Sequence, residues 1–221
     1  MKVASVASVV LVLLAGGFLL VRAQSAPSGT THAISKVGVP ITQLAKGGER
    51  ELIVQKDATA PLQVEPPPGM TVLEWRTAHA DYAMVVHVDT ITPSLTPKAD
   101  WIVSTVSAHV KQVLKNKDAA PLNENDVVSF VQQGGEAALK GMHVRAVLPW
   151  ADSFKIGNDY LIFASVTADG QRLLVPEIGS FVISPKATLM PLAHAGKDRE
   201  EMDVPLGIAT ARIQSATPLD R

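Results

Sequence analysis

The stretch that most constrains the fold is Tyr160–Val175, which reads YLIFASVTADGQRLLV. Its two apolar, β-favouring runs flank Asp169-Gly170, and a type I′ turn needs positive φ at both central residues, which Gly adopts freely and Asp tolerates. Ile156–Asp159 predicts a turn into the first run, and Pro176 ends the second because proline has no N–H to donate to a ladder. The stretch therefore predicts a bounded β-hairpin.

Other short apolar runs between turn residues predict further strands, at 82–90, 101–114, 126–132, 142–148, 180–184 and 187–192. Thr71 opens the capping-box pattern T-V-L-E, so Val72–His79 is predicted to be one short helix. Trp101–Leu114 also fits a helical period, but the Ile, Val and Thr that dominate it favour a strand. About seven strands and one helix predict a mainly β fold: a small antiparallel barrel (OB-like) or a sandwich with one short helix.

The start of the chain predicts export. Met1-Lys2 precedes the uncharged apolar run Val3–Val21, and Val21-Arg22-Ala23 places small residues at the −3 and −1 positions of a signal-peptidase site. Residues 1–23 are thus predicted to be a signal peptide that is removed before Gln24. The alternative is an uncleaved N-terminal membrane anchor, because the run of 19 residues approaches the ~20 that span a bilayer. Both alternatives predict an exported domain: periplasmic, secreted or anchored facing outside the cytoplasm.

Composition divides the remainder into three parts. Residues 24–70 are predicted to be an extended N-terminal segment, in which Val37–Ile41 and Glu51–Gln55 could form a small hairpin. Residues 71–193 are the predicted β-barrel domain. Residues 194–221 are predicted to be a charged linker and C-terminal tail, in which Val204–Ala216 either forms a small helix or is disordered.

Charge and residue types exclude several classes of protein. The net charge is −1, and −3 without Lys2 and Arg22, so no basic field is present to attract nucleic acid. The absence of cysteine excludes disulfides, Cys-ligated zinc, iron–sulfur clusters and a thiol nucleophile. There is no G-x-S-x-G elbow, and GGEAALKG at Gly134–Gly141 lacks P-loop spacing and is interpreted as a hairpin turn. No cofactor is predicted.

Histidine and aspartate provide the one candidate site. His79 with Asp81 and His87 with Asp89 form an H-x-D pair twice, and His109 lies on the next long strand. His87 and Asp89 share a strand face, and a hairpin between the two strands could bring Asp81 near His109. Imidazole and carboxylate are zinc ligands, so the candidate metal ligands are His79, His87, Asp89 and His109. The alternative is a solvent-facing strip of polar residues on an amphipathic sheet.

Several motifs resemble those of a known family. They are DYAMVVHV, HVKQVLKN, DVVSFVQQGG and FKIGNDYLIFASV, with Gly157 and Tyr160 the best single matches. Over about Val72 to Leu192, this order resembles an uncharacterised family of exported bacterial β-barrel domains, which is similar to netrin and tissue-inhibitor-of-metalloproteinase domains. The resemblance implies an OB-type barrel and carries no established activity. This chain departs from the pattern at His87, where a glycine is usual, and in lacking the cysteines that define netrin-like domains.

These observations favour a non-catalytic binding or structural module at the cell envelope, whose partner is a protein or another envelope component. Enzymes usually carry a recognisable nucleophile, metal-ligand or phosphate-binding motif, and none is legible here. Two alternatives stay open. One is a metal-dependent hydrolase that uses the His/Asp cluster, and the other is a membrane-anchored accessory subunit.

Overall fold

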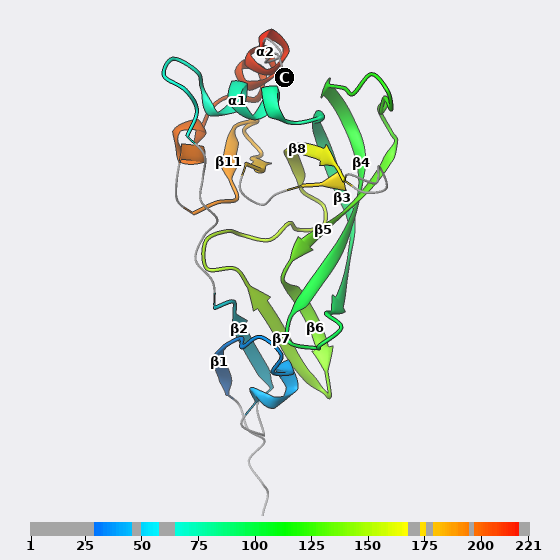
Figure 1. Ribbon diagram of the computed structural model, residues 1–221, viewed down its shortest axis with the longest axis vertical. Coiled ribbons are helices and arrows are strands. Elements are labelled where there is room, and N and C mark those ends of the chain that lie inside the picture. The colour runs from blue at the N-terminus through cyan, green and yellow to red at the C-terminus, as the bar shows by residue number, and fades with distance from the viewer. Residues whose placement is uncertain are drawn as a thin grey trace, which may run out of the picture.

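The computed structural model describes residues 29–45, 50–57, 65–167, 173–175, 179–194 and 197–216. These residues form two sheets and two α-helices, so the predicted mainly β fold is confirmed (Figure 1). The strands are β1 Thr30–Ile34, β2 Glu51–Gln55, β3 Tyr82–Leu95, β4 Ile102–Lys115, β5 Val127–Gln133, β6 Gly135–Leu139, β7 Met142–Val147, β8 Asp159–Val166, β9 Leu173–Leu174, β10 Phe181–Ile183 and β11 Leu189–Pro191. The helices are α1 Val72–His79 and α2 Leu206–Ser215, with 3-10 turns η1 Ile41–Gln43 and η2 Lys197–Glu201.

The larger sheet has seven strands in the order β11-β10-β8-β3-β4-β5-β9. The predicted hairpin is present as β8 and β9, which pair antiparallel through Ser165↔Leu174 and Val166↔Leu173; its Asp169-Gly170 turn lies outside the described residues. β9 also meets β5 in parallel, through the single pair Phe130↔Leu173. Because this contact is one pair long, the described residues do not show a closed barrel, and the two sheets fit a sandwich.

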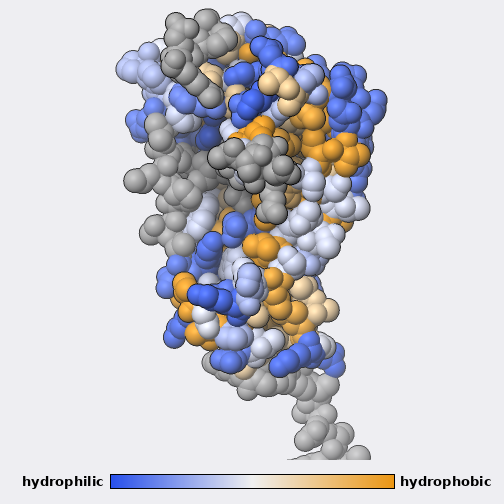
Figure 2. All heavy atoms as spheres, turned by 45° about the vertical axis from the view of Figure 1, so that its right-hand side comes forward, coloured by the Kyte–Doolittle hydropathy of each residue, from blue (hydrophilic) through white to orange (hydrophobic). Residues whose placement is uncertain are grey.

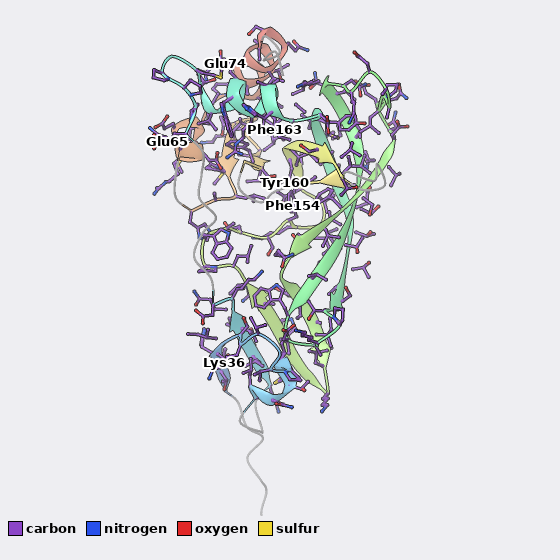
Figure 3. The ribbon with its side chains drawn as sticks, viewed as in Figure 1. Lys36, Glu65, Glu74, Phe154, Tyr160 and Phe163 are labelled. Carbon is purple, nitrogen blue, oxygen red and sulfur yellow. The ribbon has the colours of Figure 1, made fainter. Side chains whose placement is uncertain are left out.

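Strands β3 and β8 are buried on both faces along the half in which they pair. Alternate side chains such as Met84 and Ile162 point into a central core, which β4 and β5 complete with Val106 and Phe130. The side chains between them join the helix-side core, which consists of Leu73, Ala80, Ala83, Val85, Leu114, Leu161, Phe163, Phe181, Leu189, Ala209 and Ile213. In Figure 3, Phe163 lies just beneath α1, whereas Tyr160 and Phe154 lie deeper, between the two ends of the molecule. This double burial explains the uninterrupted apolar sequences of the two strands.

The two helices cover one face of this sheet. Helix α1 begins with the predicted capping box, in which the Glu74 N–H donates to the Thr71 hydroxyl (3.3 Å) and the Thr71 N–H donates to the Glu74 carboxylate (2.7 Å). Those bonds lower the pKa of Glu74, the backbone bond most strongly. No described helix has the length and apolar content that crossing a bilayer requires.

Of the two alternatives for Val204–Ala216, the small helix is the one that the structure shows: Leu206–Ser215 forms α2 and buries Ala209 and Ile213 against the helix-side core. The mainly β fold therefore carries two α-helices, where the predicted fold has one. Two carboxylates of the charged stretch are also buried: Asp198 accepts from Arg76 (2.6 Å) and Glu201 from Arg212 (2.8 Å). Burial raises the pKa of Glu201, and the Arg212 charge opposes part of that rise.

The smaller sheet has the order β1-β2-β7-β6. The small hairpin expected around β2 is not formed by the described residues: β2 pairs in parallel with both β1 and β7, and Val37–Val39 lies in a turn. The segment Gly134–Gly141 is more than the predicted hairpin turn. Gly135–Leu139 is strand β6, and Lys140-Gly141, both with positive φ, forms the turn into β7. The long β3–β4 hairpin runs along the molecule from the helix-covered end to this sheet (Figure 1).

Gly134 forms the corner that leads the chain from β5 into β6, and two separate features of this position require glycine. Gly134 has φ 86°, and a Cβ there would collide with the Ala146 carbonyl oxygen of β7. Gly141 has φ 78° in open space and is the matched control. We expect Gly134→Ala to lower the free energy of unfolding by at least about 1 kcal/mol more than Gly141→Ala, because only Gly134 adds a backbone clash to the strain. Urea denaturation measures this difference; equal losses would contradict the corner geometry.

Candidate functional site

Three strands bring polar side chains into one row on the outer face of the larger sheet. Cross-strand register places Asp159 of β8 beside His87 of β3, and His87 beside His109 of β4. A bulge between Val88 and Thr90 leaves Asp89 without a register partner, and bulges redirect side chains. We call Asp159, His87, His109, Asp89 and Lys111 the imidazole row.

The position of the row follows from alternation along β3. Ala83 and Val85 point to the outer face and are covered by the helices, and His87 is the next residue on that face. The helix cover ends there, so His87 is partly exposed. Beyond the helices, a polar side chain on this face keeps contact with water and does not pay the full desolvation cost of burial.

Each imidazole of the row is held by a carboxylate. His87 Nδ1 lies 2.7 Å from Asp159 Oδ1, and His109 Nδ1 lies 2.9 Å from Asp89 Oδ1. Lys111 Nζ donates to the second Asp159 oxygen at 2.7 Å. The two imidazole ring centres are 5.0 Å apart and tilted by 39°. Burial is the largest single influence on Asp159 and opposes ionisation, but the hydrogen bonds and charges of Lys111 and His87 together lower its pKa.

The structure brings three of the four predicted metal ligands together. His87, Asp89 and His109 share the row, but His79 ends α1, where it bonds the Trp75 carbonyl at 2.8 Å and stacks on the Trp75 ring. Five residues of strand separate His87 from the start of β3, a rise of roughly 17 Å. Asp81 is elsewhere too: its carboxylate accepts from the Val166 N–H, so Asp89 takes the place beside His109. Among the described residues, no group of three or more His, Asp or Glu is arranged to hold a metal ion.

Asp159 and Lys111 are functional candidates that sequence reasoning missed. Asp159 reads as part of the turn before β8, and only the β3–β8 register reveals it as the neighbour of His87. Lys111 stands two residues after His109 on β4, which is the one local signal that places it on the same face.

A second candidate site lies where the small sheet meets the end of the β3–β4 hairpin. We call it the junction groove; its volume is about 390 Å³, and its lining residues are Ser35, Lys36, Val37, Lys56, Asp57, Thr96, Asp100, Trp101 and Gln133. Figure 3 shows Lys36 at the small-sheet end of the molecule.

Polar contacts fix the shape of the junction groove. The Asp100 carboxylate accepts from the Thr96 hydroxyl (2.6 Å) and from the Gly38 N–H (2.7 Å), and these bonds lower its pKa, the Thr96 bond most strongly. Lys56 Nζ lies 5.6 Å above the Trp101 ring and donates to Gln133 at 3.2 Å. Trp101 is only 5% exposed, and its indole N–H has no hydrogen-bond partner among the residues described. Buried donors without partners are rare in folded proteins.

The face of the molecule that Figure 2 shows has no single large apolar patch among its described residues. Hydrophobic residues lie at several separate places on this face, with hydrophilic residues between them. The most exposed large apolar side chain among those described is Val37, at 93%, on the rim of the junction groove. Single exposed apolar residues are normal on a protein surface, so the exposure of Val37 alone does not indicate a binding site. Its position beside the groove makes it a candidate contact residue.

The two sites differ in what they can do chemically. The imidazole row lies on an open sheet face and contributes no residue to the junction groove or to the small pocket beside Trp75. An open face does not exclude water from a reacting group, whereas a concave site surrounds its ligand. Compared with protein-family models and with curated protein sequences, the chain matches none.

The contacts of Asp159 predict a pH dependence. Its native pKa lies below the ordinary 3.8, so ionised Asp159 stabilises the native state above that pH, and this contribution disappears as the pH falls through the native pKa. We expect Asp159→Asn to lose about 1 kcal/mol or less at neutral pH, as is usual for partly exposed ion pairs. The variant should also lose less stability than the wild type on acidification.

Urea denaturation at neutral pH and at a pH below 3.8 measures both effects. Asp118→Asn, in an exposed position of the loop after β4, is the matched control and should behave as the wild type does. An identical pH dependence in Asp159→Asn and the wild type would show that the contacts of Asp159 do not stabilise its ionised form.

Proposed function

We propose that this chain is an exported, non-catalytic binding module of the cell envelope, which contacts a protein segment through the junction groove. The observation that carries the proposal is the combination of a concave, charged groove with the almost fully exposed Val37 on its rim. Ile34, the last residue of β1, directly precedes the groove residue Ser35 and is 57% exposed. An apolar contact beside a few directed polar groups is the usual composition of a recognition site.

The chemistry of the groove supports a polypeptide ligand. Lys36 and Lys56 offer ammonium groups, and Asp57 offers a carboxylate, so both signs of charge are present for a partner's side chains. A partner's acceptor oxygen that reaches the edge of the Trp101 indole, in the plane of the ring, would satisfy its N–H. The groove volume is near the lower end of small-molecule sites, which favours a few side chains of a larger partner.

Within the mainly β class, we propose that the larger sheet is an OB-like barrel. The pairings run β8-β3-β4-β5-β9 and return from β9 to β8, with β5–β9 the one parallel contact in that series. This order supports the resemblance to exported β-barrel and netrin-like domains, as do the turn at Gly157, with φ 83°, and the buried Tyr160. The resemblance itself stays a proposal.

Export rests on residues 1–23, which lie outside the described residues. The proposal takes them as a signal peptide, with the membrane-anchored accessory subunit as the alternative. The absence of a P-loop, a nucleophile elbow and any cysteine supports a non-catalytic role. The metal-dependent hydrolase is not favoured, because His79 lies apart from the other three predicted ligands.

Photo-cross-linking in intact bacterial cells tests the binding role. A photoreactive residue in place of Val37 should give one discrete, higher-mass adduct, and the same residue in place of Ile156 should not. Ile156 is the matched control because it is also exposed, at 61%, but does not line the groove. Adding Lys56→Glu should weaken the Val37 adduct several-fold, because it reverses a charge in the groove. Equal labelling at both positions, or no adduct at Val37, would contradict the proposal.

The same samples report export. Mass spectrometry of the recovered protein should show Gln24 as the first residue, and the protein should fractionate outside the cytoplasm. Recovery only with membranes and at unprocessed mass would support the anchored alternative. Recovery in the cytoplasm would contradict export altogether.

A further inference from the structure

The hydrogen bonds of the imidazole row determine which ring nitrogen carries the proton. An ionised carboxylate can only accept, so Nδ1 of His87 must donate to Asp159, and Nδ1 of His109 must donate to Asp89. In neutral imidazole the other nitrogen then has a lone pair. Both Nε2 atoms are therefore in the form that ligates a metal, with Nδ1 held by a carboxylate, as in most metal-binding histidines.

The separation of the rings suits one shared ion. When an imidazole Nε2 faces a metal, a metal–nitrogen bond of about 2.1 Å places the ring centre about 3.2 Å from that metal. If both Nε2 atoms turn to the same ion, ring centres 5.0 Å apart subtend about 100° at it, which lies between square-planar and tetrahedral angles. The His87↔His109 register pair holds the two backbones at this spacing without a loop.

Charge and access also favour a cation at this place. Asp89 and Asp159 contribute two negative charges and Lys111, bonded to Asp159, one positive charge, so the surroundings of the imidazoles are net negative. The side chains of His87 and His109 are 31% and 37% exposed, so an ion from solvent can reach them. The row is thus accessible and electrostatically suited to a cation.

We propose that His87 and His109 bind one late first-row divalent cation, such as Cu²⁺ or Zn²⁺, through their Nε2 atoms. Asp159 and Asp89 act as positioning residues that hold the imidazoles, and water completes the coordination. Imidazole suits these metals, and a site with two protein ligands keeps positions open. This site needs no contribution from His79, and it is independent of the junction groove.

Calorimetric titration of the purified full chain with Cu²⁺ tests the site. The wild type should bind one equivalent of Cu²⁺ at this site, and electron paramagnetic resonance of that complex should show hyperfine splitting from imidazole nitrogen. His87→Ala and His109→Ala should each weaken binding at least tenfold. His143→Ala is the matched control, because His143 is also exposed and contacts carboxylates, but it lies on β7 of the other sheet. It should bind as the wild type does.

The positioning role has its own readout. Asp159→Asn and Asp89→Asn should keep the stoichiometry but weaken Cu²⁺ binding about tenfold, which is the usual effect of losing a carboxylate that orients a ligating histidine. Circular dichroism should show that every variant is folded. Wild-type binding no tighter than that of the His87→Ala/His109→Ala double variant would overturn the proposal. Loss of binding in His143→Ala, with binding retained in His87→Ala, would overturn it equally.

Discussion

The antiparallel pairing of β3 with β8, buried on both faces, is the interaction on which the rest of the structure depends. One face fills the central core and the other receives α1 and α2, so each strand stabilises two layers at once. A fully buried large apolar side chain contributes on the order of 2 kcal/mol, and these two strands carry several, including Met84, Leu161 and Ile162. In a chain without disulfides, this double burial is the main source of stability.

The two candidate sites lie where this double burial stops. Along β3 the outer face changes from covered apolar residues to His87, and the neighbouring strands supply Asp159 and His109 at the same level. Further along, β3 and β4 leave the helix-covered region as a long hairpin whose end meets the small sheet. The junction groove forms at that meeting, where Asp100 holds the Gly38 backbone against the hairpin. The core therefore determines where polar chemistry is tolerated.

Local signals predicted much of the fold. The T-V-L-E capping box located α1 because both of its bonds lie within one turn, and β-branched residues identified β4 as a strand although its pattern also fits a helix. Pairing between distant segments was not predictable in this way. Strands β1 and β2 pair in parallel across intervening chain, and no turn residue marks such a contact. Helix α2 lacks a strong apolar stripe, and Gly207 weakens it, so its stability comes from tertiary burial of Ala209 and Ile213.

The candidate site shows the same division. Strand alternation places His87 and Asp89 on β3, but it does not reveal the bulge that turns Asp89 toward His109 or the register that brings Asp159 to His87. Sequence spacing groups His79 with them, because spacing does not show that α1 ends at His79 and that extended chain follows from Ala80. The junction groove left no sequence signal, because its lining comes from segments that are far apart in the chain.

Native-state hydrogen exchange, followed residue by residue, tests the central claim most directly. If β3 and β8 form the doubly buried centre, the amides of Met84, Val86 and Ile162 should exchange most slowly. Their free energies of opening should be close to the free energy of global unfolding. The amides of β1 and β2 should exchange faster, because the small sheet lies at one end of the fold. Exchange of the β3 and β8 amides that is as fast as that of β1 and β2 would contradict the account.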